Sequence, residues 1–215
     1  MANKPRDAAV ATRSAQAQKA KIRQDLRRTF RNKRLALSTT QQTEAAKQLV
    51  SQFQEHAIFQ KAQNVALYLP FNGEINTQAL IEHLWSIKRN VFVPVLHPFC
   101  KGHLLFQAFT PDTQMRNNQF GILEPKLDVR YVCPLKNLQL ILTPLVAFDS
   151  SGNRLGMGGG FYDRTLHALQ NKNENNKTNV VGLAHDLQLS PTLPTETWDI
   201  PLPYILTTTK LYCFS

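Results

Sequence analysis

The stretch "FDSSGNRLGMGGGFYDRTL", residues Phe148 to Leu166, contains five of the nine glycines in the chain. It begins where the apolar run "LQLILTPLVAF" at 138–148 ends, and a helix is expected from about Phe161 to Leu169. The apolar run is typical of a strand buried on both faces of a sheet. A buried strand, a glycine-rich turn and a helix in this order predict an α/β fold.

The glycine-rich turn has the composition of an anion-binding loop. Glycine allows positive φ angles and close approach of the backbone to a ligand. Successive N–H groups and the N-terminus of the following helix then attract a phosphate, and Arg154 adds a bidentate donor. The loop has neither the G-K-[ST] ending of a Walker A loop nor the spacing of a dinucleotide loop. A purely structural turn is the alternative, and the residues favour the anion site.

Asp163 lies in the first turn of the expected helix, where the helix dipole favours a carboxylate. That is the ordinary explanation for an isolated Asp. Beside a bound triphosphate, however, a carboxylate is well suited to Mg²⁺, which combines one or two carboxylates with phosphate oxygens.

The rest of the chain continues the alternation of strands and helices. Two amphipathic helices come first, one over 19–37 and one that Ser38 or Thr39 begins. We expect a helix over 76–89 and further strands at 64–70, 90–96, 103–109, 180–184 and 204–208. The sequence thus predicts an α/β fold, a three-layer α/β/α Rossmann-like arrangement with a mostly parallel central sheet and an N-terminal pair of helices. The polar segment 171–179 is expected to be an exposed loop.

The formal net charge of +10 is confined to one end of the chain. Residues 1–37 carry +9 and the other 178 residues carry +1, so the body of the protein is nearly neutral. We therefore predict no nucleic-acid partner. Residues 1–18 are expected to be a disordered leader and residues 19–215 a single domain. No apolar run approaches the roughly 18 residues of a membrane span, so we also predict no membrane partner. The three scattered cysteines favour a reducing, cytoplasmic location.

Six ordered blocks give a more specific indication. They are "RQDLRRTFRNKRLALS", "YLPFNGEINT", "FGILEP", "LTPLVAFDSSGNRLGMGGGFYD", "VVGLAHDLQL" and "LPTETWDIPLPYILT". From about residue 20 onward the chain resembles the 5-formyltetrahydrofolate cyclo-ligases, also called methenyltetrahydrofolate synthetases. Two details depart from the family: Gly158 and Gly159 stand where some relatives carry a basic residue, and Trp198 stands where many have His.

The resemblance implies an ATP- and Mg²⁺-dependent enzyme that closes 5-formyltetrahydrofolate to 5,10-methenyltetrahydrofolate with release of ADP and phosphate. We expect a monomer. Arg154 and Asp163 match catalytic positions, and Asp163 and Asp199 match metal ligands. Leu69 and Glu74 match positions that contact the folate. Positions that match contacts to both folate and ATP are Met157, Gly158, Gly159, Gly160 and Phe161. The remaining ATP positions are Arg23, Arg27, Arg154, Leu155, Gly156 and Tyr162. Glu74 also has a plain explanation as a charge near a helix start, and Asp199 as a turn residue.

His185 and Asp186 look like an acid–base pair, because imidazole titrates near neutral pH. A structural His at a strand end is more common, so we leave both residues outside the predicted catalytic set. Two other functions are alternatives at this point. One is a non-catalytic phosphate- or nucleotide-binding module. The other, which the nearly neutral body disfavours, is an RNA-binding protein that uses the basic N-terminal helix.

Overall fold

A computed structural model describes residues 4–170 and 178–214, with the side chains of residues 4–12 and 170 excepted. The main sheet has eight strands in the order β12-β11-β10-β7-β1-β2-β3-β6. Five neighbouring strands, from β11 to β2 in this order, run parallel, and the outer strands β3, β6 and β12 each pair antiparallel with the strand on their inner side. These eight strands are β1 Asn64–Ala66, β2 Asn90–Leu96, β3 Leu104–Ala108, β6 Val132–Cys133, β7 Leu140–Pro144, β10 Asn179–Leu183, β11 Tyr204–Leu206 and β12 Leu211–Cys213.

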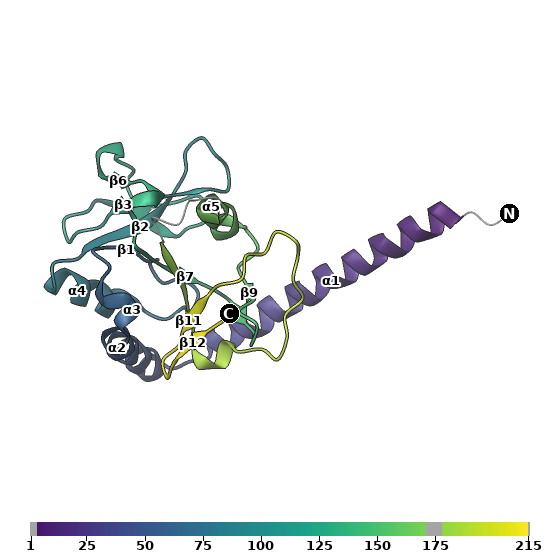
Figure 1. Cartoon of the computed structure of the whole chain (residues 1–215), viewed down its shortest axis with the longest axis horizontal. Coiled ribbons are helices and arrows are strands. Elements are labelled where there is room, and N and C mark those ends of the chain that lie inside the picture. Colours follow the sequence, from purple (N-terminus) through teal and green to yellow (C-terminus); the bar gives the residue numbers. More distant parts are fainter. Residues whose placement is uncertain (1–3, 171–177, 215) are drawn as a thin grey trace.

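Helices cover both faces of this sheet (Figure 1). On one face lie α2 Thr39–Glu55, α3 Ala57–Gln60 and α4 Gln78–Ser86, and on the other lies α5 Phe161–Gln170. Side chains of β7 alternate between the two, since Leu140 and Leu142 pack with α2 and α4 while Ile141 packs with α5. This arrangement confirms the predicted α/β fold with a mostly parallel central sheet.

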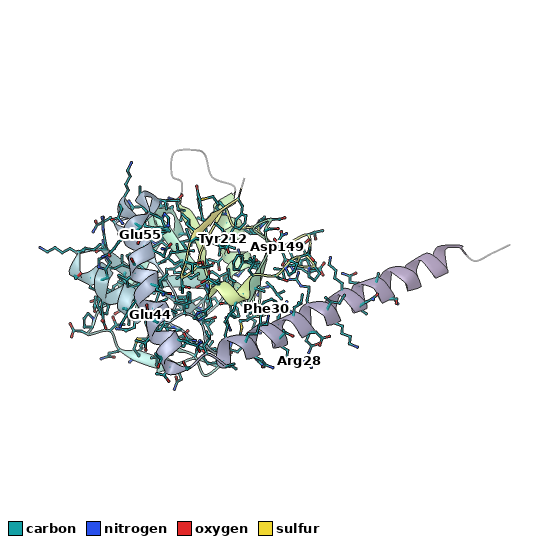
Figure 2. The ribbon with its side chains drawn as sticks, turned by 90° about the horizontal axis from the view of Figure 1, so that it is seen from below. Arg28, Phe30, Glu44, Glu55, Asp149 and Tyr212 are labelled. Carbon is teal, nitrogen blue, oxygen red and sulfur yellow. The ribbon has the colours of Figure 1, made fainter. Side chains whose placement is uncertain are left out.

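Helix α1, Lys4–Leu35, is much longer than expected, because we predicted a disordered leader over 1–18 and a helix only from residue 19. Residues 4–18 are helical in the structure, and residues 1–3 lie outside the described residues. The first half of α1 extends away from the body, and the second half docks on it (Figure 1). Figure 2 shows Phe30 on the docked side and Arg28 on the solvent side. The second helix begins as predicted, with Ser38 in a capping box with Gln41.

Two small antiparallel ribbons were not predicted. One is the hairpin of β4 Met115–Asn117 and β5 Leu123–Pro125, and the other pairs β8 Ala147–Phe148 with β9 Arg154–Leu155. The predicted strand over 138–148 is therefore wrong in extent: β7 ends at Pro144, and the chain turns into β8. Pro144 is the last residue of β7 and has no N–H to donate to the sheet. The expected loop at 171–179 falls mostly outside the described residues.

Short 3₁₀ helices complete the described structure, at Val129–Tyr131, Leu135–Asn137 and Asp186–Gln188. None of the helices formed by the described residues combines the length and apolar character needed to cross a bilayer.

Candidate active site

A cavity of about 470 Å³ opens where the parallel strands end. Tyr68 and Leu69 follow β1, and Pro144 and Leu145 lie at the end of β7, so the cavity is at the carboxyl edge of the sheet. Open α/β sheets bind their ligands at this edge. Helix α1, the β4–β5 hairpin, the glycine loop and the segment around Asp199 form the other walls.

The cavity gathers nearly every residue that the sequence singled out. Of the predicted set, the lining includes Arg23, Arg27, Leu69, Glu74, Arg154, Gly156, Met157, Gly158, Gly159, Gly160, Phe161, Tyr162, Asp163 and Asp199. Leu155 is the exception. Its side chain is 1% exposed and packs with Phe30 and Val146, so it supports the loop from below and does not line the cavity.

The glycine loop connects β9 to α5, rather than following the central strand directly. Gly158 and Gly160 have φ angles of 101° and 65°, in a region that glycine adopts far more readily than other residues. Arg164 fixes the loop, because its Nε donates to Gly102 O at 3.0 Å and its Nη2 donates to Gly159 O. The loop is thus held in one shape beside the N-terminus of α5.

Arg23 and Arg27 bring helix α1 to the cavity. Arg23 donates to both carboxylate oxygens of Asp199, at 2.5 and 3.0 Å, and to Pro194 O at 2.5 Å. The Nε of Arg27 donates to Gly156 O at 2.9 Å. Burial, together with the charge of Arg23, lowers the pKa of Arg27. The two guanidiniums are therefore oriented by protein contacts before any ligand binds.

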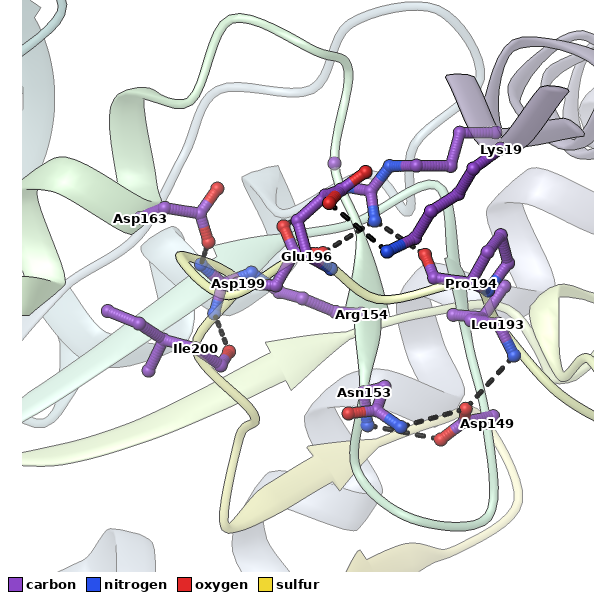
Figure 3. A network of polar contacts seen from close by, with 12 residues as sticks. Lys19, Asp149, Asn153, Arg154, Asp163, Leu193, Pro194, Glu196, Asp199 and Ile200 are labelled. Atoms are coloured by element: carbon purple, nitrogen blue, oxygen red, sulfur yellow. Dashed lines mark hydrogen bonds and ion pairs between the residues drawn. The ribbon is translucent and has the colours of Figure 1, made fainter. Parts of the chain in front are cut away.

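Arg154 reaches from β9 to Asp163 of α5 and to the segment at Ile200 (Figure 3). Its Nη1 donates to Ile200 O at 3.1 Å and its Nη2 donates to the Asp163 carboxylate. Burial lowers the pKa of Arg154, and the Asp163 and Asp199 carboxylates oppose this effect. Asp149, outside the cavity, secures the same region by accepting from Asn153 N and Leu193 N. The β8–β9 turn and the segment before Asp199 thus form one unit.

Glu74 lies in a tight turn on the opposite side of the cavity. Its carboxylate accepts from Phe71 N at 3.0 Å, and the turn carries two left-handed residues, Asn72 and Gly73. Burial raises the pKa of Glu74 to about 7, although the nearby Arg34 lowers it. This carboxylate therefore titrates in the neutral range and faces the cavity.

Comparison with known proteins identifies one family for this chain. Residues 15–208 match the model of the "5-formyltetrahydrofolate cyclo-ligase family". The chain belongs to this family. It is 54% identical over 185 residues to the 5-formyltetrahydrofolate cyclo-ligase of Haemophilus influenzae, a match that covers 86% of this chain and 96% of that one. It is 49% identical over 183 residues to the cyclo-ligase of Escherichia coli K12, covering 85% and 98%.

Solved structures agree with the assignment. The NMR structure of the Aquifex aeolicus 5,10-methenyltetrahydrofolate synthetase superposes with a TM-score of 0.75 at 27% identity, and covers 89% of this chain and 92% of that one. The Mycoplasma pneumoniae synthetase superposes with a TM-score of 0.65 at 21% identity, over 86% and 98%, and supports the fold.

The two aspartates of the cavity would suit a magnesium ion whose other ligands come from bound phosphate and water. Asp163 and Asp199 line the same cavity, each paired with an arginine. Among the described residues, no group of three or more His, Cys, Asp and Glu side chains forms a complete cation site. Mg²⁺ needs only one or two carboxylates when phosphate oxygens and waters supply the rest.

His185 and Asp186 do not form an acid–base pair in this cyclo-ligase. The Nε2 of His185 lies 3.2 Å from Gly73 O, and burial lowers its pKa to about 4. Asp186 accepts from the hydroxyls of Thr208 and Thr209. Both residues thus contact loop groups in this structure, and their place outside the catalytic set stays a prediction.

Sequence reasoning missed the apolar wall of the cavity. Leu96, Phe120 and Ile122 line it, as does the buried Glu124, whose carboxylate accepts from Leu96 N at 3.1 Å. Glu124 also accepts from Arg116 at 2.9 Å, and so fixes the β4–β5 hairpin against β2. The "FGILEP" block was the available signal, but its turn-rich composition gave no reason to place it at the site.

Proposed function

We propose that this chain converts 5-formyltetrahydrofolate to 5,10-methenyltetrahydrofolate at this cavity, with hydrolysis of ATP to ADP and phosphate. One observation carries the proposal: in this member of the family, the same cavity is lined by the glycine loop, by the three arginines described above, by Asp163 and Asp199 and, on the far side, by Glu74. A non-catalytic nucleotide-binding module would need the loop and the arginines, but not Glu74 or the pair of Asp163 and Asp199.

On the nucleotide side, the residues proposed for ATP are Arg23, Arg27, Arg154 and the loop from Gly156 to Tyr162. Backbone N–H groups of the loop and the start of α5 provide donors and a favourable dipole for phosphate oxygens. Because Gly156 O and Asp199 already orient Arg27 and Arg23, little ordering is left for the binding step.

On the folate side, the residues proposed are Leu69, Glu74 and the loop from Met157 to Phe161. The ionised Glu74 carboxylate accepts hydrogen bonds, and the amino group and ring N–H of the pterin are adjacent donors. Leu69 and Phe161 give apolar contacts. The folate and the nucleotide then meet over the glycine loop.

The chemistry needs an activated formyl oxygen, because an amide-like oxygen is a poor leaving group. The γ-phosphoryl of ATP passes to this oxygen and leaves ADP and an imidate phosphate. N10 of the folate then attacks the formyl carbon and loses its proton, and the C–O bond breaks to release phosphate. The protein aligns the two substrates, and Arg154 neutralises the charge that develops during transfer.

Asp163 and Asp199 are the residues proposed to hold Mg²⁺. When bound, the ion would neutralise charge on the phosphate oxygens. The two carboxylates are balanced by Arg154 and Arg23 in the free protein, so nucleotide phosphates compete with them for the same guanidiniums. The monomeric state, the cytoplasmic location and the lack of nucleic-acid or membrane partners remain predictions from the sequence.

The test is to mix the protein with 5-formyltetrahydrofolate, ATP and Mg²⁺ and to follow the near-ultraviolet absorbance of the methenyl product together with ADP release. We expect both to rise in step, and neither to rise when ATP or folate is left out. Binding of ATP without product would instead favour the non-catalytic module.

The Asp163→Ala variant tests the metal assignment. We expect it to lose at least about a hundredfold in kcat, since one electrostatic contact to a transition state is worth this much. Its circular dichroism spectrum should match the wild type, because Asp163 lies at the cavity surface. A folded variant with full activity would contradict the assignment.

A further inference from the structure

Arg34, near the end of α1, is a fully buried arginine. Its exposed fraction is 0%, and it is not among the residues that line the cavity. Nη1 donates to Leu145 O at 3.0 Å, while Nε and Nη2 have no hydrogen-bond partner among the described residues. An arginine so placed cannot contact nucleotide phosphates in this arrangement, so its charge must act on a neighbouring group.

The carboxylate next to Arg34 is Glu74, whose Oε1 lies 3.9 Å from Nη1. Glu74 is also buried, with 8% of its side chain exposed, but it does face the cavity. A charge pair at this distance in a desolvated setting interacts strongly. Arg34 therefore lies directly behind the carboxylate that we propose for the folate.

The turn that carries Glu74 is held from several elements. Gln42 Nε2 of α2 donates to Gly73 O at 3.1 Å, and His185 Nε2 lies 3.2 Å from the same oxygen. A Cβ on Gly73 would come within 3.0 Å of the backbone of Arg34, so the turn abuts the end of α1. The distance between Arg34 and Glu74 is thus fixed by the fold.

Four other groups surround this pair. Tyr68, after β1, and Tyr162, in α5, are buried phenols near Glu74, and burial raises the pKa of both, so they stay neutral. His185 is neutral at working pH because burial lowers its pKa. Arg31 is exposed on the outer side of α1 and acts on Arg34 from a distance. Burial is the main cause of the raised pKa of Glu74, and Arg34 is the cation that opposes it.

We propose that Arg34 is a positioning residue that keeps the Glu74 carboxylate ionised toward the folate and so sets the pH range over which the folate binds. This inference rests on the proposed function. The alternative role for Arg34 is structural, as an anchor of α1 through Leu145 O, and it makes different predictions for the dependence of KM on pH.

The experiment compares the wild type with Arg34→Gln, which removes the charge but keeps a donor for Leu145 O, and Arg34→Lys, which keeps the charge. KM for 5-formyltetrahydrofolate, KM for ATP and kcat are measured from pH 6 to 8.5 as ADP release. At pH 7 we expect Arg34→Gln to raise the folate KM about fivefold to tenfold, equivalent to roughly one pKa unit on Glu74. The effect should shrink as the pH rises.

The same variant should leave KM for ATP and kcat within about twofold of the wild type, and Arg34→Lys should keep the wild-type pH profile. In a Glu74→Gln background, Arg34→Gln should cause no further pH-dependent change, because the group through which it acts has gone. A folate KM profile that stays unshifted in Arg34→Gln, or that shifts equally in the Glu74→Gln background, would overturn the proposal.

If Arg34→Gln does not fold, as judged by thermal melting, Arg34→Lys decides the matter: a shift of its folate profile to higher pH would contradict the proposal. An inactive wild type would count against the proposed function. An active wild type with no Arg34 effect would count against this inference alone.

Discussion

At the scale of single residues, the position of each guanidinium group of α1 depends more on how the helix packs against the body than on the spacing of the arginines in the sequence. Arg23, Arg27 and Arg34 recur along one side of the helix, but Arg34 lies about three turns beyond Arg23. The first two reach the cavity, and the third is buried behind Glu74. Helical periodicity predicts that the three arginines lie on one face of α1. What each arginine contacts depends on the part of the protein that packs against its turn of the helix.

Glu74→Gln should stabilise the protein at neutral pH and leave it nearly unchanged at pH 4.5. Burial raises the pKa of Glu74 from 4.5 to about 7, so between these values the folded protein binds more protons than the unfolded chain. Wild-type stability contributed by this group therefore falls as the pH rises through this window. Glutamine has no such loss, and the difference grows to at most about 3 kcal/mol above pH 7.

Urea unfolding of both proteins at pH 5 and pH 8 measures this difference. His185, whose contribution to stability runs in the opposite direction between about pH 4 and its usual value, is present in both proteins and cancels from the comparison. A gap that is the same at both pH values would show that Glu74 is already ionised at pH 5.

Trp198 gives an optical signal for ligand binding. It lines the cavity next to Asp199 and is 62% exposed, so a bound ring system will change its surroundings. The other tryptophan, Trp85, packs with Phe109 and donates its indole N–H to Phe109 O at 2.9 Å, away from the cavity. We expect ATP or folate to change tryptophan fluorescence in a Trp85→Phe variant and to have no effect in Trp198→Phe. The reverse pattern would contradict the placement of Trp198.

At the scale of elements, the sequence predicts best where one hydrophobic pattern decides the structure. The strand over 90–96 coincides with β2, and the helix after the glycine loop begins at Phe161 as expected. The apolar side chains of this strand and of this helix determine which elements they pack against. The β4–β5 hairpin escaped prediction because its pairing depends on Glu124, which links Arg116 and Leu96 N from different segments. Such polar contacts leave no periodic trace in the sequence.

The candidate site was predictable to a similar degree. The glycine loop, both carboxylates and Arg23, Arg27 and Arg154 were all found from motifs, and the cavity brings them together. The supporting partners were not found. The distances of Arg34 to Glu74 and of His185 to Gly73 O depend on how α1 and the strand ends meet, which local sequence does not encode.

Two neighbouring glycines test whether backbone conformation matters in the loop. Gly158 has a φ of 101°, which an L side chain rarely adopts, and an added Cβ would lie 3.6 Å from the Arg27 guanidinium carbon. Gly156 has no such φ, and an added Cβ would meet nothing within 4 Å. We expect Gly158→Ala to raise KM for ATP about tenfold or more, from roughly 1–3 kcal/mol of strain, and Gly156→Ala to stay within about threefold.

Both alanine variants add the same methyl group to the same loop, so Gly156→Ala controls for bulk. Steady-state kinetics with ATP varied at saturating folate measures the effect, and thermal melting checks that each variant is folded. Equal loss in both would mean that space, rather than the left-handed conformation, limits the loop.

At the scale of the whole molecule, the long helix α1 packs with one half against a three-layer body and completes its cavity. The docked half of α1 supplies Arg23 and Arg27 to the cavity, and Lys19 pairs with Glu196 at 3.1 Å near its edge (Figure 3). The side chains of residues 13–16 are exposed, and the family match begins at residue 15. The positive charge of the N-terminal segment is thus divided between a docked part beside the proposed nucleotide site and a projecting part.

Removing the projecting part should separate these two roles. We expect a chain that begins at Arg13 to keep the wild-type melting temperature within about 2 °C and kcat/KM within about twofold, because the contacts of Lys19 and Arg23 remain. A chain that begins at Gln24 lacks both, leaves Asp199 without its guanidinium, and should lose at least about tenfold in kcat/KM for ATP. Kinetics and melting curves of the two truncations, with Arg23→Ala in the full chain as the matched control, measure the difference. A large loss of kcat/KM in the chain that begins at Arg13 would mean that the projecting half of α1 also contributes to the site.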